Sequence, residues 1–201
     1  MTRAPHSRLV SEDIEYLIDS LEQHDGMPVS ECLTELGRSS FAFVIILLSL
    51  ICALPGIPGA PGIAALFGIP ISIFGLQLAF GYDKLWLPRR IKRATLRPGK
   101  FLRGMKKLLP YLKKIEKHLK PRWPAMTNKA AHSALGLMFF ITGILVALPI
   151  PFTNSPLGLS MAIGALGLLE RDGAAISVGI GAMLLSVTII GFMATGVLHA
   201  L

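Results

Sequence analysis

Polar side chains that could support chemistry are few in the apolar part of this 201-residue sequence. Gln77 lies inside an apolar run, Asn154 lies in a proline-rich break, and three charged residues end another run at 170–172. If the apolar runs lie in a membrane, polar groups within them cost free energy and often serve function. The structural alternatives are an interhelical hydrogen bond for Gln77 and interfacial anchoring for the triplet. The candidate polar site comprises Arg38, Gln77, Asn154, Glu170, Arg171 and Asp172.

Motifs for covalent or metal chemistry do not stand out in the sequence. The histidines lack the HExxH spacing of a zinc site, and Cys32 and Cys52 form no disulfide or metal framework. We therefore expect no catalytic residue, no metal and no cofactor. A lipid-modifying enzyme ranks third among the possible functions, because neither a paired-carboxylate cleft nor an activated nucleophile is visible.

The candidate polar residues lie within or beside apolar runs, which should form the helices that position them. Hydrophobic residues make up 52% of the chain and charged residues only 16%, which is typical of an integral membrane protein. A bilayer core of about 30 Å needs about 20 helical residues, so the first, third and fourth runs are short and the last spans comfortably. Runs free of Lys, Arg, Asp and Glu cover 41–54, 63–80, 134–148, 157–169 and 174–201.

Proline and glycine interrupt the apolar sequence at two places. Because proline removes a helical hydrogen bond, each break should end one helix and produce a hydrophobic hairpin. Each hairpin is either a pair of short spanning helices joined outside the bilayer or a re-entrant hairpin whose tip stays inside it. The sequence leaves both alternatives open. The predicted helix-breaking residues are Pro55, Pro58, Pro61, Pro149, Pro151 and Pro156.

The two hairpins resemble each other in sequence. Residues 53–55 and 147–149 are both Ala-Leu-Pro, at an offset of 94. With two residues deleted after the break, Gly81 aligns with Gly173. Broken segments at matching places in two halves are typical of transporters with a binding site near the bilayer midplane. A duplicated hairpin without a pore is the alternative.

Charge predicts the orientation. Of 20 Lys and Arg residues, 16 lie between Lys84 and Lys129 against the single acid Glu116, so this connector should face the cytoplasm. Its amphipathic helix should lie in the membrane interface and attract anionic lipid headgroups, whereas nucleic-acid binding is disfavoured. The N-terminal arm, with eight acids before residue 38, is unlike a signal peptide and could rest against the connector. Ser11 should cap its first helix.

These patterns predict an all-α integral membrane protein with two repeated Pro/Gly-broken hydrophobic hairpins, a final spanning helix and cytoplasmic amphipathic helices. Small residues in the last run, Ala182 with Ser186 and Gly191 with Thr195, favour packing against a second copy, hence a homodimer. The predicted divisions are an acidic cytoplasmic arm (1–37), a first membrane hairpin (38–83), a basic connector (84–131), a second membrane hairpin (132–173) and a C-terminal transmembrane helix (174–201).

Several polar and proline motifs resemble one known family. They are LGRSSF (36–41), LPGIPG (54–59), LQLAFGYDKLWLPRRI (76–91), IEKHLKPRW (115–123), LPIPFTNSPLG (148–158) and LGLLERDG (166–173). Together they resemble the ExoD family of bacterial exopolysaccharide-synthesis membrane proteins, from about residue 10 to residue 190. The resemblance implies a bacterial inner-membrane protein associated with making exopolysaccharide, but it implies no mechanism; the apolar runs predict that the chain is multi-pass. It is compatible with a small transporter-like unit or with a non-transporting partner of a polysaccharide synthase complex.

Overall fold

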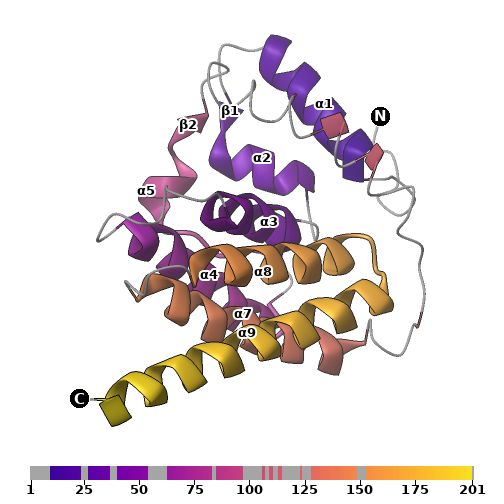
Figure 1. Ribbon diagram of the computed structural model, residues 1–201. Coiled ribbons are helices and arrows are strands. Elements are labelled where there is room, and N and C mark those ends of the chain that lie inside the picture. Colours follow the sequence, from indigo (N-terminus) through magenta and orange to yellow (C-terminus); the bar gives the residue numbers. More distant parts are fainter. Residues whose placement is uncertain are drawn as a thin grey trace. The chain divides into compact units, whose positions relative to one another are not determined.

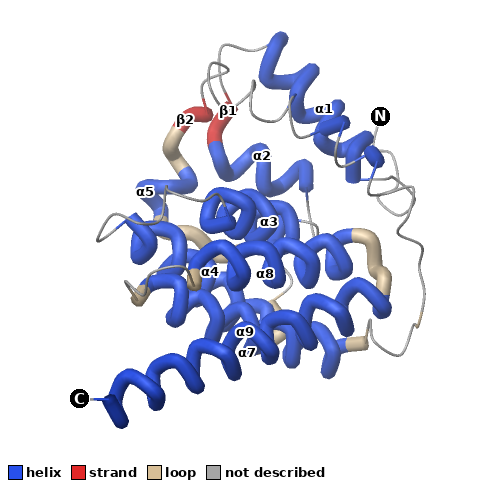
Figure 2. Tube along the Cα trace, in the orientation of Figure 1, coloured by secondary structure: helices blue, strands red, loops and turns tan. Residues whose placement is uncertain are grey.

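The structure is a computed structural model, and it divides the chain into two compact units, Met1–Ser40 with Lys84–Lys120 and Phe41–Asp83 with Pro121–Leu201 (Figure 1). In the described part of the chain, helices dominate, one short pair of strands is present, and loops and turns connect these elements (Figure 2). It comprises residues 10–23, 27–36, 40–53, 63–82, 85–96, 106, 109–110, 113–114, 123, 128–148 and 153–200.

The first unit contains the acidic arm and part of the basic connector. Its helices are α1 (Val10–Gln23), α2 (Val29–Leu36) and the single turn α5 (Arg89–Lys92). Strand β1 (Met27–Pro28) pairs antiparallel with β2 (Thr95–Leu96) and joins the arm to the connector. The predicted cap is wrong by position, because α1 begins at Val10 and the buried Ser11 lies inside its first turn.

Ion pairs confirm that the acidic arm rests against the connector. Lys106 pairs with Glu22, and Lys113 pairs with Glu15. Both members of each pair are about half exposed, so each contributes little to stability. The lysines and the glutamates are each seven residues apart, and the order of the partners is reversed. The connector at 106–113 therefore runs antiparallel to α1.

The second unit contains the apolar helices, and all five predicted runs are helical. α3 is Ser40–Ala53, α4 is Ile63–Ala79, α7 is Lys129–Ala147, α8 is Asn154–Leu169 and α9 is Gly173–Ala200. α7 and the part of α9 at Gly173–Met193 are long and apolar enough to cross a membrane, whereas α3, α4 and α8 are apolar but shorter.

α7 is longer than the sequence predicts. The apolar run begins at residue 134, but the helix begins at Lys129, after Asn128. The Asn128 side chain accepts a hydrogen bond from the Ala131 amide at 2.8 Å and so caps the helix. The cap carries helical structure back through polar residues, which brings α7 to 19 residues. The prediction that the third run is too short to span was therefore wrong.

The breaks lie mostly outside the described residues, including Pro55, Pro58, Pro61, Pro149 and Pro151. Pro156 is described, and its assignment as a helix breaker was wrong, because it lies in the first turn of α8. An amide there has no acceptor within the helix, so proline removes no hydrogen bond at that position.

Glycine allows α4 and α7 to pack backbone against backbone. A Cβ atom at Gly68 would lie 2.5 Å from the Gly143 carbonyl oxygen, and one at Gly75 would lie 2.8 Å from the Gly136 oxygen. Both distances are too short for any side chain. Because the partner number falls from 143 to 136 as the α4 number rises, the two helices are antiparallel.

α8 uses glycine on two sides. A Cβ atom at Gly158 would lie 2.6 Å from the Ser49 oxygen and 2.6 Å from the Ala53 nitrogen of α3. Further along α8, Gly164 lies against Gly179 and Gly167 against Ile176, which pack α8 on α9. α8 therefore has close contacts with both α3 and α9.

α4 and α8 end in the same way. Gly81 (φ 74) and Arg171 (φ 52) are both left-handed, and each lies two residues after its helix. The Tyr82 amide donates to the Gln77 oxygen at 3.1 Å, and the Asp172 amide donates to the Gly167 oxygen at 2.9 Å. These ends align at an offset of 90. At that offset Gly81 matches Arg171 in backbone conformation, whereas the sequence comparison aligned Gly81 with Gly173.

Candidate functional site

Gln77 lies in the last turn of α4, where the residue is 9% exposed. Two residues later, Ala79 touches α7, because a Cβ atom at Gly136 would lie 2.4 Å from the Ala79 nitrogen. The end of α4 that carries Gln77 is therefore packed against the first half of α7. Its position is compatible with the interhelical role expected of a buried amide.

Asn154 is the first residue of α8 and is 8% exposed. It lies one turn before Gly158, the residue that contacts the end of α3. The neighbouring Thr153 is buried too, and its side chain makes no capping hydrogen bond. Asn154 therefore marks the end of the bundle at which α8 begins.

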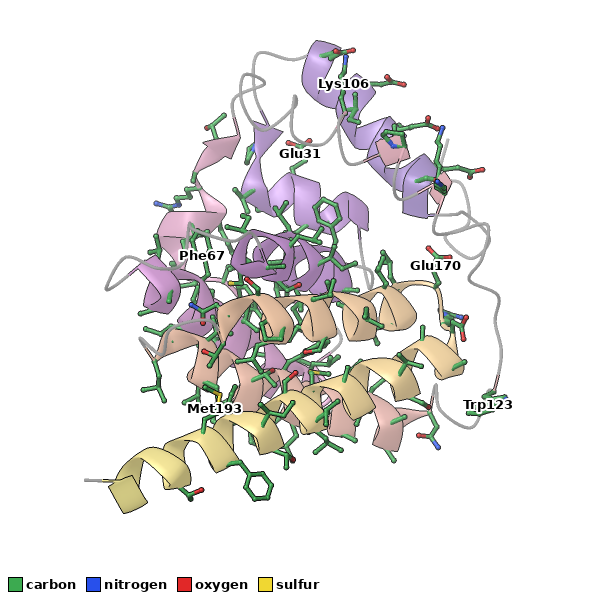
Figure 3. The ribbon with its side chains drawn as sticks, in the orientation of Figure 1. Glu31, Phe67, Lys106, Trp123, Glu170 and Met193 are labelled. Carbon is green, nitrogen blue, oxygen red and sulfur yellow. The ribbon has the colours of Figure 1, made fainter. Side chains whose placement is uncertain are left out.

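The triplet at 170–172 forms the turn from α8 to α9 (Figure 3). The Glu170 amide donates to the Leu166 oxygen at 3.0 Å and closes α8. Arg171 is exposed and takes the left-handed conformation that reverses the chain. Asp172 is 4% exposed, and its Oδ1 accepts hydrogen bonds from Ala174 (2.9 Å) and Ala175 (3.3 Å). Asp172 therefore caps α9, a structural role that the charge pattern did not reveal.

The candidate residues divide between two ends of the helical unit. α7 is antiparallel to α4, and the short connection at 148–153 makes it antiparallel to α8 as well. Gln77 and the triplet therefore lie at one end, and Asn154 lies at the other. The 16 residues of α8 separate Asn154 from Glu170 by about 24 Å. Arg38 lies outside the described residues.

Large apolar side chains fill the space between α7, α8 and α9. Phe139, Met161 and Ile176 are fully buried, and Gly164 lies against Leu135 and Met183. Two buried hydroxyls in this unit bond to their own helices, Ser72 to the Gly68 oxygen (3.0 Å) and Thr142 to the Met138 oxygen (2.6 Å). The described histidine, cysteine and acidic residues form no group that could hold a metal ion. This interior suits packing better than polar chemistry.

An apolar groove of about 330 Å³ runs between α4 and α7. The sequence analysis missed it, because aliphatic residues in an apolar run carry no signal for a groove. Ser72 is a polar residue in the lining, and its hydroxyl donates to its own helix. The groove therefore suits a hydrocarbon chain better than a sugar. Its other main lining residues are Ile69, Ile73, Leu76, Phe140 and Ile144.

Comparison with known proteins identifies the family. The family model described as "Exopolysaccharide synthesis, ExoD" matches residues 10–192. The chain belongs to the ExoD family. The match extends from the start of α1 to the last third of α9 and includes every candidate polar residue. The family expected from the sequence motifs is therefore confirmed.

Two relatives align with most of this ExoD-family chain. An uncharacterized protein of Synechocystis sp. is 34% identical over 159 residues, which cover 76% of this chain and 74% of the relative. The protein named ExoD of Rhizobium meliloti is 26% identical over 176 residues, which cover 86% of this chain and 72% of that protein. No solved structure matches the chain.

Proposed function

We propose that this protein supports exopolysaccharide synthesis or export as a multi-pass protein of the bacterial inner membrane. The observation that carries the proposal is the family match over residues 10–192. The named relative from Rhizobium meliloti supports the same process. The acidic arm and the basic connector lie in the cytoplasm, since the cations concentrate at 84–129.

The packing favours a non-transporting membrane partner of a polysaccharide synthase complex. A permeation path needs polar groups or water along its length. In the described helices, buried hydroxyls such as those of Ser49 and Thr142 bond to their own backbones. At Gly68 and Gly143 the backbones of α4 and α7 touch, and the groove between these helices is apolar rather than polar. The protein therefore acts through its surfaces, with the polysaccharide-synthesis machinery as its partner.

A transporter-like unit is the second candidate, and the similarity of the two hairpins favours it. Gly68 meets Gly143 and Ala147, and Gly158 meets Ser49 and Ala53. Ser49 and Ala53 are the residues 94 positions before Gly143 and Ala147. We infer that the hairpins are repeats of one unit, the relationship associated with midplane binding sites in transporters.

The turn at Glu170, Arg171 and Asp172 is the proposed polar site of contact, since it sets exposed and buried charges side by side. A homodimer through α9 is also part of the proposal. A Cβ atom at Gly191 would touch nothing within 4 Å, so this part of α9 has room for a second copy.

Cysteine accessibility in native membranes distinguishes the two candidates. The background chain carries Cys32→Ser and Cys52→Ala and must still restore polysaccharide production to a deletion strain. In separate variants of this chain, a single cysteine replaces Thr142 or Asn154. The partner function predicts that a hydrophilic thiol reagent does not reach Thr142→Cys, because position 142 is fully buried between α7 and α9. Labelling at 142 from the aqueous phase would instead support a transporter. Failure of the full chain to restore production would overturn the exopolysaccharide role itself.

A further inference from the structure

The segment between α4 and β2 presents a tryptophan and a row of cations. Leu85 and Leu87 are each 7% exposed, whereas Trp86 between them is 57% exposed. Arg89 and Arg93 are exposed and lie one turn apart, and the Arg93 amide donates to the Arg89 oxygen at 3.2 Å. Residues 85–96 contain four cations and no acid. This segment is therefore both aromatic and strongly basic.

This segment is anchored within its own unit. The Val29 amide donates to the Ala94 oxygen at 2.9 Å, next to the β1–β2 pair. The contact holds the end of the segment that follows Arg93.

The cations of segment 85–96 differ in their ion pairing from those further along the connector. Lys106 and Lys113 are already paired with Glu22 and Glu15. Among the described side chains, no carboxylate lies within ion-pair distance of Arg89 or Arg93. Arginine binds phosphate through two parallel hydrogen bonds, and tryptophan concentrates at the membrane–water interface. The charge and the exposed indole match an anionic lipid surface.

We propose that residues 86–93 dock on the anionic headgroups of the cytoplasmic leaflet. Trp86 enters the interface, and Arg89 and Arg93 bind lipid phosphates. The proposal rests on the proposed membrane location. It assigns lipid binding to this short segment and leaves the 106–113 lysines to hold the acidic arm.

Fluorescence of the full chain in vesicles tests the proposal. Trp123→Phe leaves Trp86 as the single tryptophan. The vesicles contain phosphatidylcholine alone or mixed with phosphatidylglycerol, and the quenchers are a lipid nitroxide near the headgroup and aqueous iodide. Phosphatidylglycerol should increase quenching by the nitroxide and decrease quenching by iodide. Each arginine favours association with an anionic leaflet about fivefold, so Arg89→Gln with Arg93→Gln should abolish this lipid dependence.

The matched control is Lys106→Gln with Lys113→Gln, which removes the same charge and should keep the dependence. Iodide quenching that is equal in both lipids would overturn the proposal and point to water or an acidic protein surface beside Trp86. Membrane insertion has its own readout. In a chain with Trp86→Phe and Trp123→Phe, Leu137→Trp places the indole at an exposed position in the middle of α7. If a deep nitroxide quenches Trp emission there, the membrane location stands whatever Trp86 shows.

Discussion

The α3–α4 and α7–α8 hairpins use glycine at matching places but close with different turns. Gly68 and Gly158 each touch the backbone of a helix from the other hairpin. After α4 the turn reads Phe-Gly-Tyr at 80–82, and after α8 it reads Glu-Arg-Asp at 170–172. Two backbone hydrogen bonds recur in both turns, from residues 80 and 170 to residues 76 and 166, and from residues 82 and 172 to residues 77 and 167. Close packing therefore requires glycine at these positions. The turn itself does not require the charges at 170–172, because the turn after α4 forms without charged residues.

A second difference follows from α9. α8 carries Gly164 and Gly167 where it packs on α9. At the offset of 90 given by the helix ends, α4 has Phe74 and Gln77 instead. The extra glycines of α8 thus lie where this helix has an additional neighbour.

The largest effect is expected from the charges that only the second turn carries. Glu170→Gln and Arg171→Gln should each abolish exopolysaccharide production, because each removes a charge from the proposed polar site of contact. The protein should still reach the membrane at its normal level. Polysaccharide yield and an immunoblot of the membrane fraction provide the two measurements.

Lys106→Gln and Lys113→Gln are the controls for this prediction, since their half-exposed ion pairs contribute little. Both should be mild. Loss of the Glu170 or Arg171 variant from the membrane would indicate anchoring instead of a site. Normal polysaccharide production by both the Glu170 and the Arg171 variant would contradict the proposed site.

The next effect concerns the contact between α4 and α7. Gly75→Ala should lower stability by about 1–3 kcal/mol, since overpacking forces the backbones apart. A Cβ atom there would lie 2.6 Å from the Phe140 nitrogen. Gly181→Ala is the matched control, because a Cβ atom at position 181 has nothing within 4 Å. Unfolding of the purified protein in detergent measures both, and equal midpoints would show that the helices can separate freely.

The sequence predicted the helices better than their partners. Charge-free runs bounded by Gly and Pro located α3, α4, α8 and α9 within about three residues, close to the usual error of boundaries. The contact between Gly68 and Gly143 could not be predicted, because a glycine in an apolar helix does not indicate which helix it faces. The start of α7 was missed because Asn128 was not considered as a cap.

The candidate site divides in the same way. Glu170, Arg171 and Asp172 were predicted as one group, and they do form one turn. The role of Asp172 was missed, although an aspartate followed by a long apolar helix is a signal for an N-cap. Asn154 was grouped with the triplet, but the length of α8 separates them. The polar residues were grouped by type alone, without considering that a helix of this length places its first and last residues far apart.

Equivalent glycines should respond equally if the two hairpins share one packing rule. Gly68→Ala and Gly158→Ala place the new methyl group 2.5 Å and 2.6 Å from backbone atoms, so their melting temperatures in detergent should fall by similar amounts. Gly181→Ala, where a Cβ atom meets nothing within 4 Å, should not change the melting temperature appreciably. A neutral Gly158→Ala beside a destabilising Gly68→Ala would show that the α3–α8 contact yields more easily.

The cap of α9 has no counterpart after α4, where Tyr82 occupies the matching position. Asp172→Ala should cost about 1 kcal/mol, because the amides of Ala174 and Ala175 lose their acceptor. Asp172→Ser keeps a capping oxygen without the charge and should recover most of that stability. Chemical unfolding in detergent compares them. An equally unstable serine variant would assign the effect to the carboxylate charge.

The last comparison concerns the left-handed residues themselves, where the expected effect is no larger. Gly81 is open on all sides, so Gly81→Ala should cost about 1 kcal/mol from backbone conformation alone. Arg171 has φ 52, and Arg171→Gly should gain a similar or smaller amount. Arg171→Ala keeps the strain and controls for loss of the side chain. If Arg171→Gly is more stable yet fails to support polysaccharide production, the second turn retains a strained arginine for its charge. If Arg171→Gly is more stable and fully active, the arginine at position 171 serves neither stability nor polysaccharide production.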